Sequence, residues 1–304
     1  MKNFFKNTSR RIVIGSVIII FTLIGFKTIA KDDEFLNAHI NKSLQPFPVV
    51  FIKDFLEEYE LQSEDAYQCY IRGNAYRDLG DYQKAVEEFT KAIKINPNHA
   101  ESYNNRGYVY YMLNQYDKAV ADFNKSIELN NPDLYIPYNN LGNVYNNLKQ
   151  YDKAIFYLNK SLEINPNYDL AYNNRGRIYL NLKKYDAATA DLKKAIEINP
   201  DYDSPYLNLG LVYHELKQDE TAISYYTKAV EVNPNFSMAY NNRGFSYQTL
   251  KQYEKAIAEF TKSIELDPTN HLPYLNRAEC YKKLGETEKA RADLEKVTQL
   301  GKKN

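Results

Sequence analysis

A repeating interval of 34 residues constrains this chain of 304 residues more than any other feature of its sequence. Six glycines, most of them closing a Tyr-Asn-Asn-Arg-Gly motif or a close variant, recur with gaps of 34, 35, 34, 34 and 34 residues: Gly73, Gly107, Gly142, Gly176, Gly210 and Gly244. Ala278 continues the series after a further 34 residues. A fixed period in this range predicts a repeat array, in which each repeat covers the apolar face of its neighbour.

Several other positions keep the same period. Each of the seven small residues is followed by Tyr three positions later, by Ala twelve positions later and by a large hydrophobe sixteen positions later. Asn-Pro or Asp-Pro closes five of the repeats, at Pro97, Pro166, Pro200, Pro234 and Pro268. Each repeat therefore predicts two short amphipathic helices joined by a polar turn, and the proline stops the second helix.

This pattern resembles the tetratricopeptide repeat (TPR) family, with a small residue at position 8, Tyr at 11, Ala at 20 and Pro at 32 of each repeat. The resemblance implies an all-α fold, a right-handed superhelical solenoid of seven helix-turn-helix repeats. It covers residues 66–304 as seven consecutive repeats: 66–99, 100–134, 135–168, 169–202, 203–236, 237–270 and 271–304. Repeat 2 departs from the pattern by an extra residue near Asn131–Pro132, and repeat 7 lacks the closing proline. Polar residues in repeat 7, Arg291 and Thr298, replace the hydrophobes on which an eighth repeat would dock, as a terminal cap requires.

Two positions on different helices change together. Arg stands at position 7 in five repeats, and Leu141 and Leu209 replace it in the other two. Position 23, on the second helix, is acidic in the five Arg repeats and is Tyr157 or Tyr225 in the two Leu repeats. Covariation of this kind indicates contact, so we predict an ion pair within each repeat rather than a row of anion-binding arginines. The predicted pairs are Arg72–Glu88, Arg106–Asp122, Arg175–Asp191, Arg243–Glu259 and Arg277–Asp293.

A row of asparagines is the candidate binding surface. Positions 2, 5, 6, 9, 12 and 13 share one side of the first helix, and the TPR resemblance implies that this side lines a concave groove. Position 6 is Asn in six repeats, at Asn105, Asn140, Asn174, Asn208, Asn242 and Asn276. An Asn carboxamide can bond both the C=O and the N–H of an extended peptide. The row is similar to the asparagine ladder of O-linked N-acetylglucosamine transferases; the alternative is that it serves packing or reflects an Asn-rich composition.

The N-terminus has a different composition. A basic stretch, Met1–Arg11, precedes the uncharged run Ile12–Phe26, and Ala30 offers a small residue for cleavage. This order predicts either a signal peptide within residues 1–30 or an uncleaved signal anchor. The run would be about 22 Å long as a helix, shorter than the roughly 30 Å hydrocarbon core of a membrane. Both alternatives place everything after residue 30 across the membrane, in a periplasmic, extracellular or lumenal compartment. Residues 31–65 are expected to form a linker and a capping helix over Val49–Gln62.

Net charge and the lack of catalytic motifs limit the classes of function that the sequence allows. The formal net charge is zero, which gives no electrostatic footprint for nucleic acid. We find no phosphate-binding loop, no HExxH motif and no nucleophile elbow, and the two cysteines and four histidines have no metal-ligand spacing. We therefore expect a non-enzyme without cofactor or metal, which binds extended protein segments as an exported or membrane-anchored scaffold. The alternative is a purely structural scaffold that uses its convex face.

Overall fold

The structure is a computed structural model that describes residues 65–301. The predicted signal or anchor segment, 1–30, and the predicted linker and capping helix, 31–65, lie outside the described residues apart from Asp65. Asp65 caps the first described helix, because its side chain accepts a hydrogen bond from the backbone N–H of Gln68. Among residues 65–301, no helix combines the length and the apolar character needed to cross a membrane.

Residues 65–301 fold into fourteen helices and contain no strand, which confirms the all-α prediction. We call the helix that opens each repeat its first helix and the other its second helix. The pairs are α4 (Ala66–Asp78) and α5 (Tyr82–Ile95), α6 (Ala100–Met112) and α7 (Tyr116–Glu128), α8 (Tyr135–Asn147) and α9 (Tyr151–Ile164), α10 (Asp169–Asn181) and α11 (Tyr185–Ile198), α12 (Asp203–Glu215) and α13 (Asp219–Val232), α14 (Ser237–Thr249) and α15 (Tyr253–Leu266), and α16 (His271–Lys283) and α17 (Thr287–Gly301). The first helices begin at the residues where the expected repeats begin.

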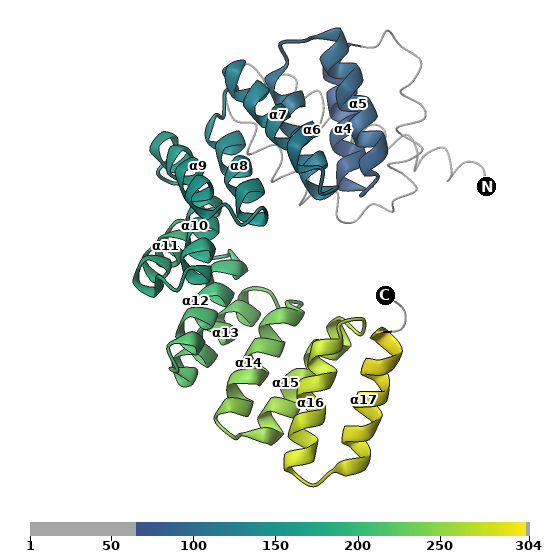
Figure 1. Ribbon diagram of the computed structural model, residues 1–304, viewed down its shortest axis with the longest axis vertical. Helices are drawn as coiled ribbons and strands as arrows, with labels where there is room; N and C mark the ends of the chain where they lie inside the picture. The colour runs from purple at the N-terminus through teal and green to yellow at the C-terminus, as the bar shows by residue number, and fades with distance from the viewer. Residues whose placement is uncertain (1–64, 302–304) are drawn as a thin grey trace, which may run out of the picture. The chain divides into compact units, whose positions relative to one another are not determined.

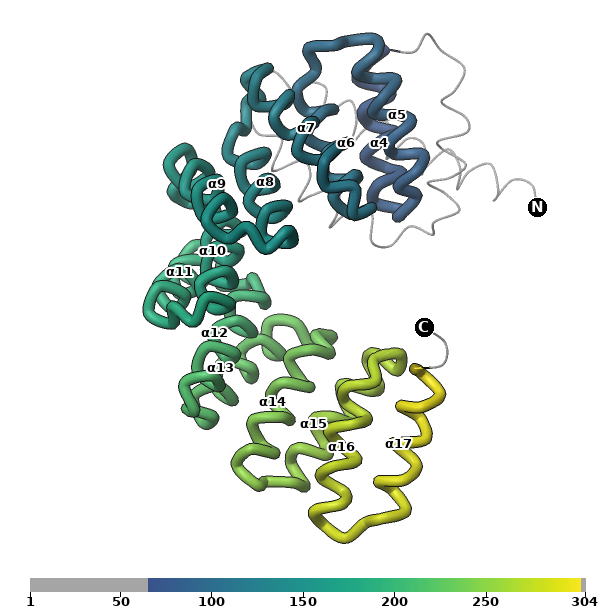
Figure 2. The backbone as a smooth tube through the Cα atoms, in the orientation of Figure 1, coloured from purple at the N-terminus to yellow at the C-terminus, as the bar shows by residue number. Residues whose placement is uncertain are grey.

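The pairs stack one after another along the chain, as a solenoid does (Figure 1). Each second helix contacts its own first helix and the first helix of the next repeat. Successive first helices also contact one another, as the backbone trace shows for neighbouring pairs (Figure 2). Within residues 65–301 the main contacts between helices therefore run within a repeat or between adjacent repeats, and the first helices form a continuous layer that carries the asparagine row.

The two helices of a repeat approach closely because position 8 has no side chain. A Cβ atom on Gly73 would lie 2.6 Å from Cε1 of Phe89, and one on Gly142 would lie 2.6 Å from Cγ of Leu158. Both of these large side chains are fully buried. The fixed spacing of sixteen residues between the glycine and the large hydrophobe is thus a contact across the helix pair.

The turn between the two helices contains one residue with a positive φ in every repeat. This residue ends the first helix in a left-handed conformation, which glycine and asparagine tolerate best. The seven residues are Gly80, Asn114, Lys149, Lys183, Lys217, Lys251 and Gly285. Four of the seven turns therefore place lysine in a conformation that costs a side-chain-bearing residue free energy.

The extra residue of repeat 2 is absorbed in the loop before α8. Asn130 takes a positive φ of 53°, and the buried Asn131 donates from Nδ2 to Oγ of Ser126 at 2.9 Å. Oδ1 of Asn131 accepts from the backbone N–H of Asp133. At the end of the array, Arg291 and Thr298 are exposed, whereas the hydrophobes at the same positions of earlier repeats are partly or fully buried.

Candidate functional site

The covarying arginines and acids are in contact, which confirms the predicted ion pairs. Arg175 donates from Nε and Nη2 to the two carboxylate oxygens of Asp191, each at 2.7 Å. These side chains are 18% and 10% exposed, so the pair is mostly withdrawn from water. The same first-to-second-helix pair forms in the other four Arg repeats: Arg72–Glu88, Arg106–Asp122, Arg243–Glu259 and Arg277–Asp293. We call these five pairs the clasps.

In the two Leu repeats, apolar and aromatic packing replaces the clasp. Leu141 and Leu209 are fully buried. The ring of Tyr157 stacks on Tyr145 with centroids 5.3 Å apart, and the ring of Tyr225 stacks on Tyr213 with centroids 5.2 Å apart. A Leu and Tyr combination therefore fills the same space between the two helices without any charge.

Each clasp outside repeat 1 also reaches back to the preceding repeat. Nη1 of Arg175 donates to Oδ1 of Asn159 at 2.6 Å, and Nη1 of Arg277 donates to Oγ1 of Thr261 at 2.9 Å. Arg106 and Arg243 make the same contact with threonines. The sequence prediction did not include this contact with the preceding repeat, although the residue type at position 25 of that repeat indicates it. It is Thr or Asn before every one of these arginines.

Burial and pairing act in opposite directions on the clasp groups. Burial lowers the pKa of Arg106, but the hydrogen bonds and the charge of Asp122 outweigh it, and the net pKa of Arg106 is raised. At Glu259 the balance is reversed, because burial raises the pKa of this carboxyl more than Arg243 lowers it. Removal from water thus opposes the attraction between the paired charges in these clasps, as is common for buried ion pairs.

The asparagine row forms hydrogen bonds between successive first helices. The side chain of Asn174 donates from Nδ2 to Oδ1 of Asn139, at position 5 of the preceding repeat, over 2.9 Å. Asn140, Asn208 and Asn276 donate to position 5 of the preceding repeat in the same way, and Asn105 donates to Asn74 and to the hydroxyl of Tyr70. We call each such bond a rung. Five of the six asparagines therefore join neighbouring repeats, a structural role that agrees with the packing alternative left open by the sequence.

Asn242 is the exception. Position 5 of the preceding repeat is Leu207, which has no acceptor for the carboxamide of Asn242. Among residues 65–301 the side chain of Asn242 makes no hydrogen bond, and neither its nitrogen nor its oxygen is buried. The row is therefore interrupted between α12 and α14.

The face that carries the row also exposes apolar side chains. We call positions 2, 5, 6, 9, 12 and 13 of the first helices the first-helix face. Its exposed large hydrophobes are Tyr67, Tyr108, Met112, Leu170, Met238, Phe245, Leu272 and Leu275. Exposed apolar groups gathered on one face, among polar groups with spare bonding capacity, are typical of an interaction surface.

Comparison with known families decides the classification of the chain. Models described as tetratricopeptide repeat match residues 100–131, 135–168, 157–190, 205–236, 237–270 and 259–292, and a model described as TPR repeat matches 73–114 and 176–217. The chain belongs to the tetratricopeptide repeat family. A search of curated proteins found no match to this TPR sequence.

Solved structures share the TPR fold at low sequence identity. The crystal structure of the APC/C hetero-tetramer Cut9–Hcn1 matches with a TM-score of 0.66 and 18% identity, over 76% of this chain and 45% of that one. Pseudomonas aeruginosa pilF matches with a TM-score of 0.60 and 19% identity, over 66% of this chain and 91% of that one. A tetratricopeptide repeat protein from Parabacteroides merdae matches with a TM-score of 0.60 and 20% identity, over 78% and 93%. This chain spans less than half of the Cut9–Hcn1 structure's chain, and at these identities the likeness shows the fold.

The TPR array contains one cluster whose residue types are those of a nucleophilic enzyme. Nδ1 of His214 lies 2.6 Å from Oδ1 of Asp219 and 3.5 Å from Oγ of Ser246. Both contacts use the same imidazole nitrogen, and Ser246 is fully buried. The arrangement therefore joins repeats 5 and 6 but does not present a serine to a substrate. Within the described part of the chain, no group of three or more His, Cys, Asp or Glu residues could hold a metal ion.

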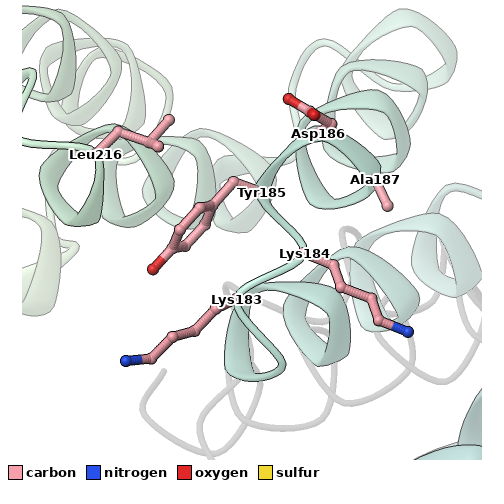
Figure 3. Close-up of a pocket in the computed structure, with 6 residues that line it drawn as sticks. All are labelled: Lys183, Lys184, Tyr185, Asp186, Ala187 and Leu216. Atoms are coloured by element: carbon pink, nitrogen blue, oxygen red, sulfur yellow. The ribbon is translucent and has the colours of Figure 1, made fainter.

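A hollow of about 420 Å³ lies beside the turn of TPR repeat 4 (Figure 3). Lys183 and Lys184 line it with their side chains directed away from each other, and Tyr185 and Leu216 form its apolar part. Both lysines are exposed, so the hollow holds no buried polar group that could orient a ligand.

The rungs predict different stabilities for two chemically identical substitutions. Asn174→Ala removes a rung and leaves Oδ1 of Asn139, a buried residue, without its donor, so we expect the free energy of unfolding to fall by about 1 kcal/mol. Asn242→Ala removes no hydrogen bond and should leave stability unchanged or raise it by about 0.5 kcal/mol, since Ala favours the helix. Urea unfolding followed by far-UV circular dichroism measures both. Equal losses for the two variants would show that the rungs do not stabilise the array.

Proposed function

We propose that this TPR protein binds extended, largely uncharged polypeptide segments along its first-helix face, which lines a concave groove of a right-handed superhelix. TPR arrays are scaffolds suited to protein–protein interaction. The observation that carries the proposal is the coincidence, on one face, of a carboxamide row and eight exposed apolar side chains. The partner is a protein or peptide, with no nucleic acid, cofactor or metal involved and no catalysis.

The rungs leave the asparagines capable of binding a peptide. In the rungs after the first, the asparagine uses one of its two N–H groups, so one N–H and the Oδ1 acceptor are left. Asn105 is different, because its Nδ2 donates to both Asn74 and Tyr70 and its Oδ1 accepts from Asn104. The Oδ1 atoms of Asn140, Asn174, Asn208 and Asn276 accept no hydrogen bond among residues 65–301, and none of these atoms is buried. A side chain held by a rung has already lost its rotational freedom, which lowers the entropic cost of binding. Backbone recognition of this kind is independent of the partner's sequence.

We further propose that the scaffold is translocated to the far side of a membrane. The basic stretch and apolar run of residues 1–30 support export, either with cleavage near Ala30 or with anchorage through Ile12–Phe26. The intact mass of the mature protein distinguishes the two, because cleavage removes about 30 residues. A mature chain found uncleaved in the cytoplasm would contradict both.

One exposed aromatic residue on a second helix supports a second function, that of a structural scaffold. Phe156, on the second helix α9, is 54% exposed, and Nζ of Lys160 lies 5.8 Å from the centre of its ring. The same position in the other repeats is Glu, Ala or Ser. A single exposed aromatic there is the feature expected if the chain is a structural scaffold that contacts partners through its second helices.

Selection of peptides against the full chain distinguishes the two functions. A library of random nonapeptides displayed on phage is the probe, and fluorescence anisotropy gives the Kd of the selected peptides. In the double variant Tyr108→Glu/Phe245→Glu, two charges enter the first-helix face at side chains already 38% and 41% exposed. We expect this variant to bind the selected peptides at least tenfold more weakly, since each charge must be removed from water on binding.

The control is Phe156→Glu, which introduces one such charge on a second helix at an aromatic side chain that is 54% exposed. We expect unchanged peptide affinity for this control and unchanged unfolding midpoints for both variants. The reverse pattern, with binding lost only in Phe156→Glu, would support the convex-face scaffold instead. A library that yields no peptide sensitive to the double variant would contradict the proposed function.

A further inference from the structure

The junction between α12 and α14 differs in chemistry from the other junctions of the first-helix face. Elsewhere, the position-6 asparagine is tied to the preceding first helix by a rung. Here Leu207 removes the acceptor, and the accessible carboxamide of Asn242 keeps both N–H groups and both lone pairs of Oδ1. Asn242 is thus the asparagine of the row with the greatest bonding capacity toward a ligand.

Apolar side chains occupy other positions of the first-helix face on the same two helices. On α14, Met238 is 56% exposed and Phe245 is 41% exposed, and on α12 the partly buried Leu211 occupies position 9. The ring of Phe245 packs edge-on against His214, with centroids 5.3 Å apart, which holds the phenyl group in place. Position 9 in the two preceding repeats is instead polar, Asn143 and Arg177.

Positions 2, 5, 6 and 9 of α12 and α14 carry no charged residue, although the exposed Glu215 stands at position 13 of α12. Arg243 is the only charged residue of α14, and both of its outer guanidinium donors are taken, by Glu259 and by Thr227. On α12, Oδ2 of Asp203 accepts a hydrogen bond from Asn233, and Asp219 at the start of the next helix is bonded to His214. A charged partner residue beside these four positions would lose its hydration without gaining an opposite charge from them.

We propose that the α12–α14 stretch, formed by Leu211, Met238, Asn242 and Phe245, anchors a bulky apolar side chain of the bound segment. Asn242 bonds the C=O and N–H of the partner backbone beside that side chain. The proposal rests on the proposed function and specifies the partner further. The partner is an extended, uncharged segment with a Phe, Leu or Met residue at the anchor. Elsewhere the row reads only the backbone, so this stretch sets the register of the bound segment.

The test uses the tightest nonapeptide selected against the full chain, together with a version in which its apolar residues are replaced by Ser. We expect apolar residues to be enriched in the selected peptides, and the Ser version to bind at least tenfold more weakly. Asn242→Ala should weaken binding of the selected peptide about tenfold with an unchanged unfolding midpoint. Asn140→Ala, a matched change at a rung two repeats before the α12 repeat, should weaken binding by a smaller factor of about three, because that side chain has fewer groups to offer.

A second variant tests the same idea without removing Asn242. Leu207→Asn places an acceptor at position 5, at the 35-residue spacing that joins Asn173 to Asn208 in the preceding rung. The introduced carboxamide should engage Asn242, so we expect weaker peptide binding even though the first-helix face loses no ligand group. The unfolding midpoint of this variant establishes that it is folded.

Three results would overturn the anchor. The first is unchanged affinity in Asn242→Ala, and the second is selection of peptides rich in Asp, Glu, Lys or Arg. The third is self-association of the full chain that Phe245→Glu abolishes in sedimentation velocity, because a second copy would then occupy the stretch. Failure of the proposed function is separate from all three, since it would appear as peptides insensitive to Tyr108→Glu/Phe245→Glu.

Discussion

Replacement of Asp191 by Ala should lower the free energy of unfolding by about 3 kcal/mol. The substitution removes one half of a clasp and leaves the guanidinium of Arg175, only 18% exposed, without its carboxylate. Asn159 still accepts one hydrogen bond from Nη1, but it carries no charge to balance the arginine. Urea unfolding monitored by far-UV circular dichroism measures the loss, and Asp186→Ala, at an exposed carboxylate on the same helix, is the control.

Two other repeats of this chain suggest a pair of substitutions that should restore the lost stability. Repeats 3 and 5 fill the clasp position with Leu and Tyr, so Arg175→Leu combined with Asp191→Tyr should recover most of the stability lost in Asp191→Ala. The reason is that a packed apolar pair avoids the desolvation that the ion pair must overcome. A double variant no more stable than the single one would show that the surrounding repeat, and not the pair, determines which solution fits.

A side chain at position 8 should be nearly as damaging. In Gly142→Val, the new Cβ would lie 2.6 Å from Cγ of Leu158 and 3.3 Å from the backbone oxygen of Ala154. Neither neighbour is a flexible chain end, so the two helices must separate, and we expect a loss of about 3 kcal/mol in the free energy of unfolding. The urea midpoint and the near-UV signal of the neighbouring tyrosines report the change.

The control for this prediction is Gly301→Val, since no atom lies within 4 Å of a Cβ placed on Gly301. That variant should unfold at nearly the same urea concentration as the unchanged chain. Shortening the opposed side chain in Gly142→Val/Leu158→Ala should restore part of the lost stability, because the volume is redistributed rather than added. If shortening Leu158 instead adds its full cost to that of the valine, steric contact between the two is not the cause.

The fold and the clasps were predictable because each leaves a periodic trace in the sequence. The 34-residue period marks every helix pair, and the joint change of Arg and acid to Leu and Tyr marks a contact sixteen residues apart. The extra residue of repeat 2 was equally visible, since it shifts one interval to 35. Repetition supplies seven copies of the same structural problem within one chain, and each difference between copies is informative.

The rungs were not predicted, although their residues were singled out. Positions 5 and 6 both belong to the first-helix face, and helical geometry alone gives no reason for position 6 to turn toward the preceding repeat. The relevant comparison lies between repeats: Asn242 stands alone because Leu207 precedes it by 35 residues. Such a contact depends on how two repeats dock, which is a tertiary property that no single-repeat pattern contains.

The residue type at the left-handed turn differs between the end repeats and the interior repeats of the described array. The first and last repeats of the described array have glycine at this turn, Gly80 and Gly285, whereas four interior repeats have lysine. A lysine in this conformation costs roughly 1 kcal/mol relative to glycine. Within residues 65–301, an interior repeat packs against a repeat on each side, whereas the first and last described repeats each pack against one. The cost of a lysine at this turn is thus found only in repeats that pack against a repeat on both sides.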